Sequence, residues 1–148
     1  MVRLPPPVWA FIYAVLAGAA SAAWPWRRLL DFRVLPLGAV LLAGGLALSL
    51  WAALLFRAEG TEINPTSPSN KKLVIRGPFR WTRNPMYLAI VIFTLGLAFA
   101  IGALPMFAVP LLVYATANFV HIPFEEAKMR RQFGAAFDDY AARVRRWL

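Results

Sequence analysis

Long uncharged stretches alternate with short charged ones along the chain. Three stretches lack Asp, Glu, Lys and Arg altogether, namely 4–26, 34–56 and 84–124. A helix that spans a membrane needs about 20 apolar residues, so the first two stretches hold one helix each. The third is 41 residues long and holds two shorter helices with a turn near 102–105. The pattern predicts spanning helices at 8–26, 35–56, 85–101 and 105–122.

Prolines mark the ends of these predicted elements. Pro85 suits the first turn of the third helix, where its missing N–H has no cost. Pro110 is expected to kink the fourth helix, and Pro123 to change the chain direction after it. The segment 57–76 is polar and contains Pro65 and Pro68, so we expect a loop without regular structure there.

A second kind of helix is predicted at the C-terminal end. Phe133, Phe137, Tyr140, Val144 and Leu148 are spaced by 4, 3, 4 and 4 residues, which places them on one face of a helix. The other face is rich in charge, and basic amphipathic helices of this kind lie on membrane surfaces. The expected fold class is therefore an all-α integral membrane protein with four transmembrane helices and a C-terminal cytoplasmic amphipathic helix.

The 148 residues are expected to form a single membrane domain. Within it we distinguish an N-terminal helix pair (1–56), a cytoplasmic loop (57–84), and a catalytic hairpin with its tail (85–148). Composition agrees with this picture, because 60% hydrophobic residues are more than a soluble protein of this size can bury.

The net charge of +9 is unevenly distributed over the chain. With four spans, the N-terminus, the loop and the C-terminal tail lie on one side and hold 13 of the 16 Lys and Arg residues. Lysine and arginine accumulate on the cytoplasmic side, so both termini are predicted to be cytoplasmic, in the inner or cytoplasmic membrane. Membrane topology therefore accounts for the positive charge, and we do not expect nucleic acid as a partner. The absence of cysteine excludes disulfides and thiol nucleophiles.

The N-terminal stretch permits a second interpretation. Arg3, an apolar run and the small residues of "AGAASAAW" are also typical of a secretory signal with a cleavage site. Cleavage would leave three spans, an arrangement with the two termini on opposite sides. We therefore prefer a spanning helix at this position.

Two polar clusters stand at the ends of the predicted hairpin, where the third helix begins and the fourth ends. Their members are Arg80, Arg83, Asn84 and Tyr87 in the first cluster and His121, Glu125 and Glu126 in the second. Paired carboxylates bind an ammonium or sulfonium group, and arginine binds a carboxylate through two parallel hydrogen bonds. Together the clusters suit a zwitterion. Pairing of Glu126 with Arg130 along one helix, and contacts of arginines with lipid phosphates, explain the same residues equally well.

Other chemistry is weakly represented in the sequence. His121 is the only histidine, and a lone histidine near a membrane face is more often an interfacial residue than a catalyst. No metal-ligand spacing, glycine-rich phosphate loop or Ser-His-Asp set occurs, so no metal site is predicted.

The stretch "GPFRWTRNPMY" at 77–87 is similar to a pattern of the isoprenylcysteine carboxyl methyltransferase and phospholipid methyltransferase superfamily. Those integral membrane proteins carry Gly-Pro-aromatic and Arg-His-Pro-x-Tyr before a membrane hairpin. A Glu-Glu pair, Phe-Gly and a spaced Tyr follow in the tail. Here the tail has Glu125-Glu126, Phe133-Gly134, Tyr140 and Val144. The resemblance covers about residues 62–148.

The resemblance implies a membrane methyltransferase that uses S-adenosylmethionine, held between hairpin and tail without a Rossmann domain. It implies a lipophilic acceptor, either an isoprenylcysteine-like carboxylate or a lipid head group, among membrane lipids. The residues implied to bind the cofactor are Gly77, Pro78, Asn84, Pro85, Tyr87, Glu125, Glu126 and Tyr140. The residues implied to be catalytic are Arg83, His121 and Glu126.

Several positions depart from the family pattern. Asn84 stands where the family often has His, Ala89 where it has Gly, and Arg145 where a Pro usually follows the tail Val. His121 lies where the isoprenylcysteine enzymes place an arginine. These changes leave the acceptor open. The alternative is a non-enzymatic small scaffold or partner subunit that retains the fold, whereas a transporter is disfavoured because no charge lies within a span.

Overall fold

The computed structural model describes residues 4–23, 31–60 and 72–148, and within them it is helical, with no strand. The principal helices are α1 (Pro6–Ala23), α2 (Leu35–Ala58), α3 (Pro85–Ile101), α4 (Ala108–Thr116), α5 (Ile122–Phe133) and α6 (Ala135–Arg143). Two 3-10 turns, η2 (Gly77–Arg80) and η3 (Leu104–Phe107), precede α3 and α4. A π-helical turn at Ala117–His121 joins α4 to α5.

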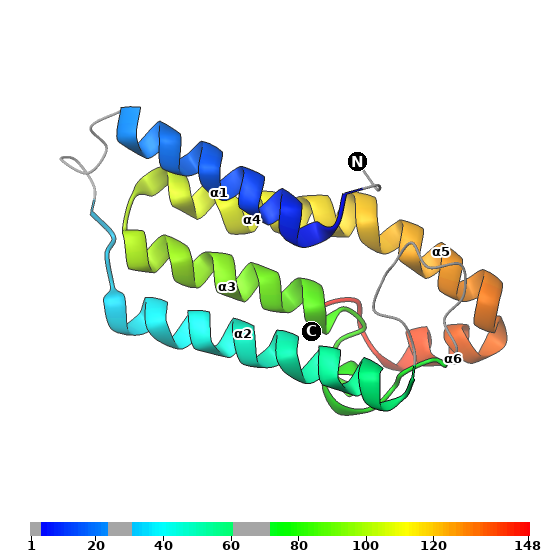
Figure 1. Cartoon of the computed structure of the whole chain (residues 1–148). Coiled ribbons are helices and arrows are strands. Elements are labelled where there is room, and N and C mark those ends of the chain that lie inside the picture. The colour runs from blue at the N-terminus through cyan, green and yellow to red at the C-terminus, as the bar shows by residue number, and fades with distance from the viewer. Residues whose placement is uncertain (1–3, 24–30, 61–71) are drawn as a thin grey trace.

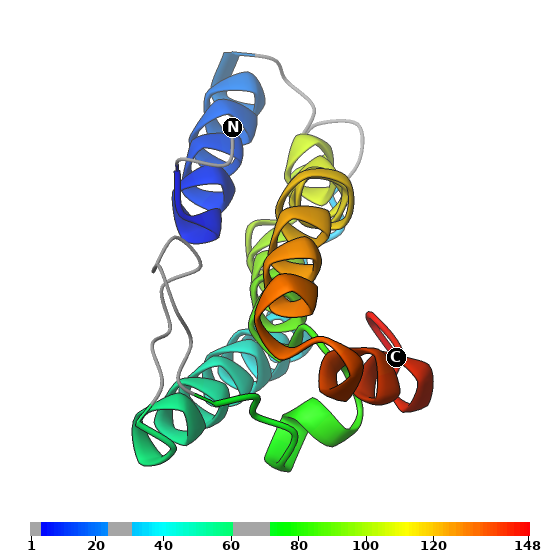
Figure 2. The same ribbon diagram turned by 90° about the vertical axis from the view of Figure 1, so that its right-hand side faces the viewer.

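The helices lie side by side in the order α2, α3, α4, α1 (Figures 1 and 2). Three helical segments of the described chain are long and apolar enough to cross a membrane, at Pro6–Ala23, Leu35–Ala58 and Leu104–Phe133. The apolar helix α3 is shorter, with 17 residues. The expected all-helical membrane class is therefore confirmed, with three candidate spanning helices.

Glycines bring α2 and α3 into close contact. A Cβ atom at Gly38, Gly45 or Gly96 would lie 2.7–2.9 Å from backbone atoms of the opposite helix. Backbones in lipid approach this closely only where side chains are small. Gly38, Gly45 and Gly96 are thus part of the seam that holds α3, and with it the start of the hairpin, on α2.

The fourth predicted helix does not end at 122. It runs on as a single helix to Phe133, and α4 and α5 lie in one line (Figure 1). Pro123 was expected to change the chain direction, and this expectation was wrong. Proline cannot donate a helical hydrogen bond, but the π turn just before it widens the helix and absorbs the mismatch. Pro110 lies in the first turn of α4, where no kink is required.

The predicted C-terminal amphipathic helix is also divided. α5 ends at Phe133, Gly134 adopts a positive φ of 52°, and α6 begins at Ala135. The five apolar positions therefore do not share one helical face. Phe137 and Tyr140 are buried, whereas Leu148 is 71% exposed.

The turn of the hairpin is where the sequence placed it. α3 ends at Ile101, and Gly102 has a φ of 78°, a left-handed conformation that suits glycine. Here the chain that enters α2 lies against the turn, because the amide of Phe32 donates to the Gly102 carbonyl at 3.0 Å. The observed α1 begins at Pro6 rather than at 8, and α2 continues to Ala58. The predicted end of the first helix at 24–26 and the loop residues 61–71 lie outside the described residues.

Candidate functional site

The start of α3 is fixed by a compact turn. Pro78 lies in the first turn of η2 and is fully buried, and Gly77, with a φ of 59°, packs against Leu55 and Trp51 of α2. The backbone N–H of Asn84 donates to the hydroxyl oxygen of Thr82 at 3.1 Å, and the buried Pro85 opens the helix. The predicted positions Gly77 and Pro78 thus shape the turn that presents the next residues.

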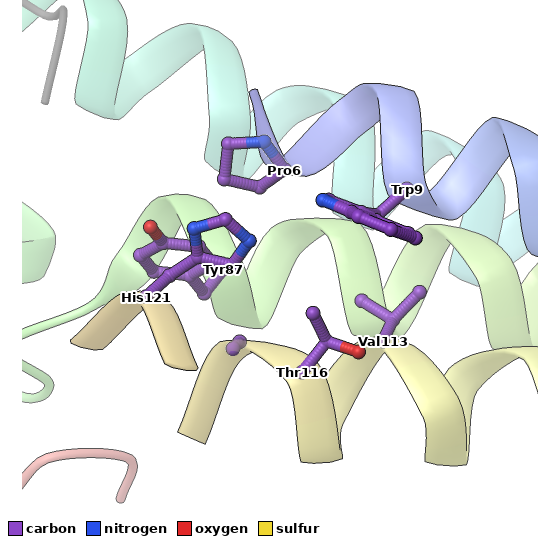
Figure 3. A pocket seen from close by; sticks show the side chains of 7 residues that line it. Pro6, Trp9, Tyr87, Val113, Thr116 and His121 are labelled. Atoms are coloured by element: carbon purple, nitrogen blue, oxygen red, sulfur yellow. The ribbon is translucent and has the colours of Figure 1, made fainter. Parts of the chain in front are cut away.

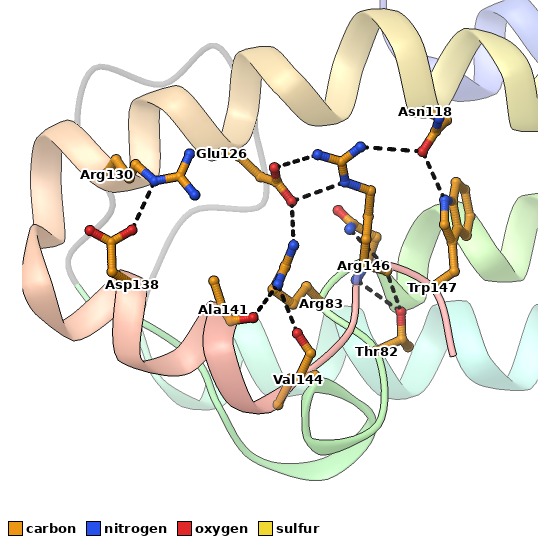
Figure 4. A network of polar contacts seen from close by, with 11 residues as sticks. Thr82, Arg83, Asn118, Glu126, Arg130, Asp138, Ala141, Val144, Arg146 and Trp147 are labelled. Carbon is orange, nitrogen blue, oxygen red and sulfur yellow. Dashed lines mark hydrogen bonds and ion pairs between the residues drawn. The ribbon is translucent and has the colours of Figure 1, made fainter.

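Glu126 binds two arginines from different parts of the chain (Figure 4). Nη2 of Arg83 donates to its Oε1 at 2.9 Å, and Nη2 of Arg146 donates to its Oε2 at 2.7 Å. Nε of Arg146 reaches Oε1 at 3.2 Å. The Glu126 side chain is only 11% exposed, so these charge-assisted bonds form in a largely desolvated place. The hydrogen bond to Glu126 raises the pKa of the Arg146 guanidinium, which therefore stays charged.

The last residues of the chain, 144–148, form what we call the C-terminal strap. Nη1 of Arg83 donates to the carbonyls of Ala141 and Val144 at 2.7 and 2.8 Å. The carbonyl of Arg146 accepts hydrogen bonds from Thr82 Oγ1 at 3.1 Å and from Asn84 Nδ2 at 2.9 Å. Residues at the start of α3 are thereby bonded to the strap as well as to α5.

An indole holds the far end of the strap. Nε1 of Trp147 donates to Oδ1 of Asn118 in the π turn at 3.0 Å, and the Trp147 ring lies 4.7 Å from that of Tyr114. Nη1 of Arg146 reaches the same Asn118 oxygen at 3.4 Å. Asn118 therefore couples the strap to the long helix.

Glu125 faces a different partner from its neighbour. The hydroxyl of Tyr87 donates to Oε1 of Glu125 at 2.5 Å, and the Tyr87 ring stacks on that of His121 with centroids 6.1 Å apart. The two clusters predicted from the sequence therefore do meet. The pairing of Glu126 with Arg130 is not found, because Arg130 binds Asp138 of α6 at 2.8 Å.

A small, mainly apolar pocket opens beside Tyr87 and His121 (Figure 3). Its free volume is about 10 Å³, close to what one water molecule needs. Its walls come from α1, α3, α4 and the π turn. The lining residues are Pro6, Trp9, Tyr87, Val113, Thr116, Ala117 and His121.

Two buried polar atoms stand out at this site. Among the described residues, only Nε of Arg83 and Nε2 of His121 are buried side-chain polar atoms without a hydrogen-bond partner. Buried polar groups are nearly always paired, and each exception calls for an explanation. Both exceptions here lie next to the Glu125–Glu126 pair.

The structure gathers most of the predicted site residues into two groups. Arg83, Asn84 and Glu126 form one with the strap, and Tyr87, Glu125 and His121 form the other. Tyr140 is outside both, because its buried hydroxyl donates to the Phe79 carbonyl at 2.7 Å and burial raises the pKa of this phenol. Sequence reasoning missed three contributors, which are Arg146, Trp147 and Asn118. The adjacent Arg145 and Arg146 offered no sign of which side chain faces inward.

Comparison with known proteins yields one match. The family model of phospholipid methyltransferase matches residues 34–136, more than two thirds of the chain. The match covers α2, the hairpin and α5, and it leaves out α1 and the strap. No curated protein and no solved structure matches the chain.

Proposed function

Because the chain belongs to the phospholipid methyltransferase family, within the superfamily that includes the isoprenylcysteine enzymes, we propose that it transfers a methyl group from S-adenosylmethionine to a lipophilic acceptor. Family membership supports a membrane-bound methyltransferase. The cofactor, the acceptor and the role of each residue are our proposal.

One observation carries the proposal beyond the family. Two buried polar atoms among the described residues are unpaired: Nε of Arg83, whose guanidinium binds Glu126, and Nε2 of His121, whose ring stacks on Tyr87 of the Tyr87–Glu125 pair. A packing scaffold gains nothing from buried polar atoms without partners, whereas a binding site supplies the partner with its ligand. The proposed site therefore lies between Arg83 and His121.

The residues present suit a zwitterionic sulfonium cofactor. The free Nε–H of Arg83 can donate to its carboxylate, and the Glu125 carboxyl can accept from its ammonium group. Asn84, Pro85, Tyr87 and Glu126 complete the proposed binding set, while Gly77, Pro78 and Tyr140 contribute by shaping the turn and the tail. Bound there, S-adenosylmethionine supplies an electrophilic methyl group on sulfur.

Glu126 has a modified role in this scheme. Both of its oxygens already accept from guanidinium groups, so it holds Arg83 and Arg146 in place rather than leaving its charge free for a cation. Methyl transfer depends on alignment in a dry site more than on strong acid-base groups. A carboxylate fixed from two sides provides that alignment.

We propose four spanning helices, with α3 as the shortest and both termini in the cytoplasm. At 1.5 Å per residue, α3 is about 26 Å long, slightly less than a hydrocarbon core of about 30 Å. The helix Leu104–Phe133 is about 45 Å long, so α5 extends beyond the bilayer. In the proposed topology Glu125 and Glu126 lie at the cytoplasmic surface, next to the strap.

The acceptor is proposed to approach from within the bilayer. The residues of α3 above the site, including Leu88, Ile90 and Val91, are apolar, and the surrounding loop and tail are basic. Each buried methylene of an acceptor contributes about 0.8 kcal/mol, so the membrane concentrates and orients long-chain acceptors. The candidates are an isoprenylcysteine-like carboxylate and a lipid head group.

Binding of S-adenosylhomocysteine to the purified protein tests the proposal directly. Titration calorimetry in detergent should detect binding, and Arg83→Gln and Tyr87→Phe should each weaken it at least tenfold. Asp138→Asn, which removes an exposed ion pair, serves as the matched control and should bind like the parent. A well-folded parent protein that binds no cofactor would instead support the alternative of a non-enzymatic scaffold or partner subunit.

A further inference from the structure

The pocket beside Tyr87 is built partly by α1. Pro6 and Trp9 form its wall on one side, opposite Tyr87 and the π turn (Figure 3). α1 lies outside the residues that the family model matches. The wall that α1 supplies is therefore a feature of this chain that family membership does not assign.

His121 presents its unpaired nitrogen to this pocket. The residue is 3% exposed and lines the pocket, and its Nε2 has no partner among the described residues. His121 is the last residue of the π turn, where one extra residue per turn changes the directions of side chains relative to a regular α-helix. Single π turns of this kind are frequent at functional sites.

The pocket ends at the proposed transfer site. The imidazole of His121 stacks on Tyr87 at an angle of 26°, and the Tyr87 hydroxyl binds Glu125. A group seated in the pocket is thus adjacent to the residues proposed to hold the cofactor. The free volume of about 10 Å³ admits a terminal group, not a ring or a large head group.

The lining determines which terminal group is compatible. None of the seven lining residues is Lys, Arg, Asp or Glu, and Glu126 binds the guanidinium groups of Arg83 and Arg146. A carboxylate moved into this pocket would lose its hydration without gaining a cation from any of the described lining residues. A nucleophile that carries a hydrogen finds an acceptor in Nε2 of His121 and aromatic faces in Trp9 and Tyr87.

We infer that this pocket receives the reactive end of the acceptor, that the acceptor is a hydrogen-bearing nitrogen or sulfur nucleophile on an apolar chain, and that His121 takes its proton. The inference rests on the proposed function and narrows its substrate class. The lone pair of the nucleophile forms a bond to the methyl carbon, and the carbon–sulfur bond of the sulfonium donor breaks with its electron pair going to sulfur. The proton of the nucleophile passes to Nε2 of His121. Trp9 determines the fit of the acceptor.

Nuclear magnetic resonance can observe this imidazole alone, because His121 is the only histidine. Protein labelled with ¹⁵N-histidine and purified through a histidine-free tag should be titrated in micelles with dodecylamine, dodecanethiol or dodecanoate. The three probes share one hydrocarbon tail and differ in the terminal group. The Nε2 resonance should shift with the amine or the thiol and stay in place with the carboxylate. A shift with dodecanoate alone, or with none of the probes, would overturn the inference.

Variants separate the acceptor site from the cofactor site. Trp9→Ala should raise KM for the tailed acceptor at least tenfold, while Phe11→Ala, which removes a 70% exposed aromatic from the same helix, should match the parent. His121→Gln should lower kcat about 100-fold or more, as expected on loss of a proton acceptor. Both pocket variants should bind S-adenosylhomocysteine normally. Unchanged turnover in His121→Gln with normal cofactor binding would refute the inference alone, whereas loss of cofactor binding by the parent protein would refute the proposed function.

Discussion

Replacing Gly45 by alanine tests the close packing of α2 on α3. The added Cβ would lie 2.8 Å from the carbonyl oxygen of Ala89 and from the amide nitrogen of Phe93. Ordinary contact begins at 3.4 Å, so the approach is 0.6 Å too short. Both neighbours are backbone atoms of α3 and cannot rotate away. The helices must therefore move apart along their seam.

Gly44 is the matched control, because it is the adjacent residue of the same helix and a Cβ there meets nothing within 4 Å. Both substitutions gain the helix preference of alanine over glycine, about 1 kcal/mol, so this contribution cancels between them. The remaining steric contribution is the usual penalty for overpacking, about 1–3 kcal/mol. A gap of 0.5–1 Å also forfeits roughly a quarter to a half of each dispersion contact along the seam.

The assay is reversible unfolding in mixed micelles titrated with dodecyl sulfate and followed by helical circular dichroism. Gly45→Ala should be less stable than Gly44→Ala by about 1–3 kcal/mol, and Gly44→Ala should equal or exceed the parent. Equal unfolding midpoints for the two variants would refute the close approach of α2 and α3 at Gly45.

Three further predictions concern the tail and the topology. Tyr140→Phe should lower stability by about 1–2 kcal/mol near neutral pH, because it leaves a buried carbonyl unpaired. Burial raises the pKa of Tyr140 in the folded state, so the phenol of the unfolded chain loses its proton at a lower pH. The stability that the phenol contributes should therefore decline above about pH 10. The thermal midpoints of the parent and the variant should converge from about pH 8 to about pH 11. Arg146→Gln should weaken the binding of S-adenosylhomocysteine measured by calorimetry. Arg146→Lys should restore part of the affinity, because a cation again faces Glu126. Equal affinities of the parent and the two variants would contradict this prediction. In the naturally cysteine-free chain, Ala136→Cys should resist a membrane-impermeant thiol reagent in intact cells and Arg33→Cys should react, and the reverse pattern would overturn the proposed topology.

Sequence reasoning located α3 well because its two ends depend on local chemistry. Pro85 suits only the first turn of a helix, and Gly102 takes the left-handed conformation that ends it. The same reasoning failed at Pro123, since a proline can either stop a helix or follow a π turn. It failed again at the tail, where periodicity continues through Gly134 although the backbone does not.

The sequence predicted which residues meet at the candidate site better than it predicted their individual partners. The meeting of Arg83 and Tyr87 with the Glu125–Glu126 pair is confirmed, since antiparallel helices of a hairpin bring their distant ends together. The different protein partners of the two carboxylates were not predicted. Consecutive residues of a helix point about 100° apart, so Glu125 meets α3 while Glu126 meets the strap.

The sequence by itself determined the membrane class, the approximate positions of the helices and the polar motif. Uncharged, apolar stretches of about 20 residues are most stable in the hydrocarbon core of a bilayer, and the ends of the helices follow from local chemistry. The tertiary structure alone decided the partners. Arg146 reaches Glu126 across 20 positions of the chain, and Nε2 of His121 has no partner among the described residues in a pocket that Trp9 also lines. Such contacts depend on how helices pack against one another, and no periodicity within a single segment encodes that packing.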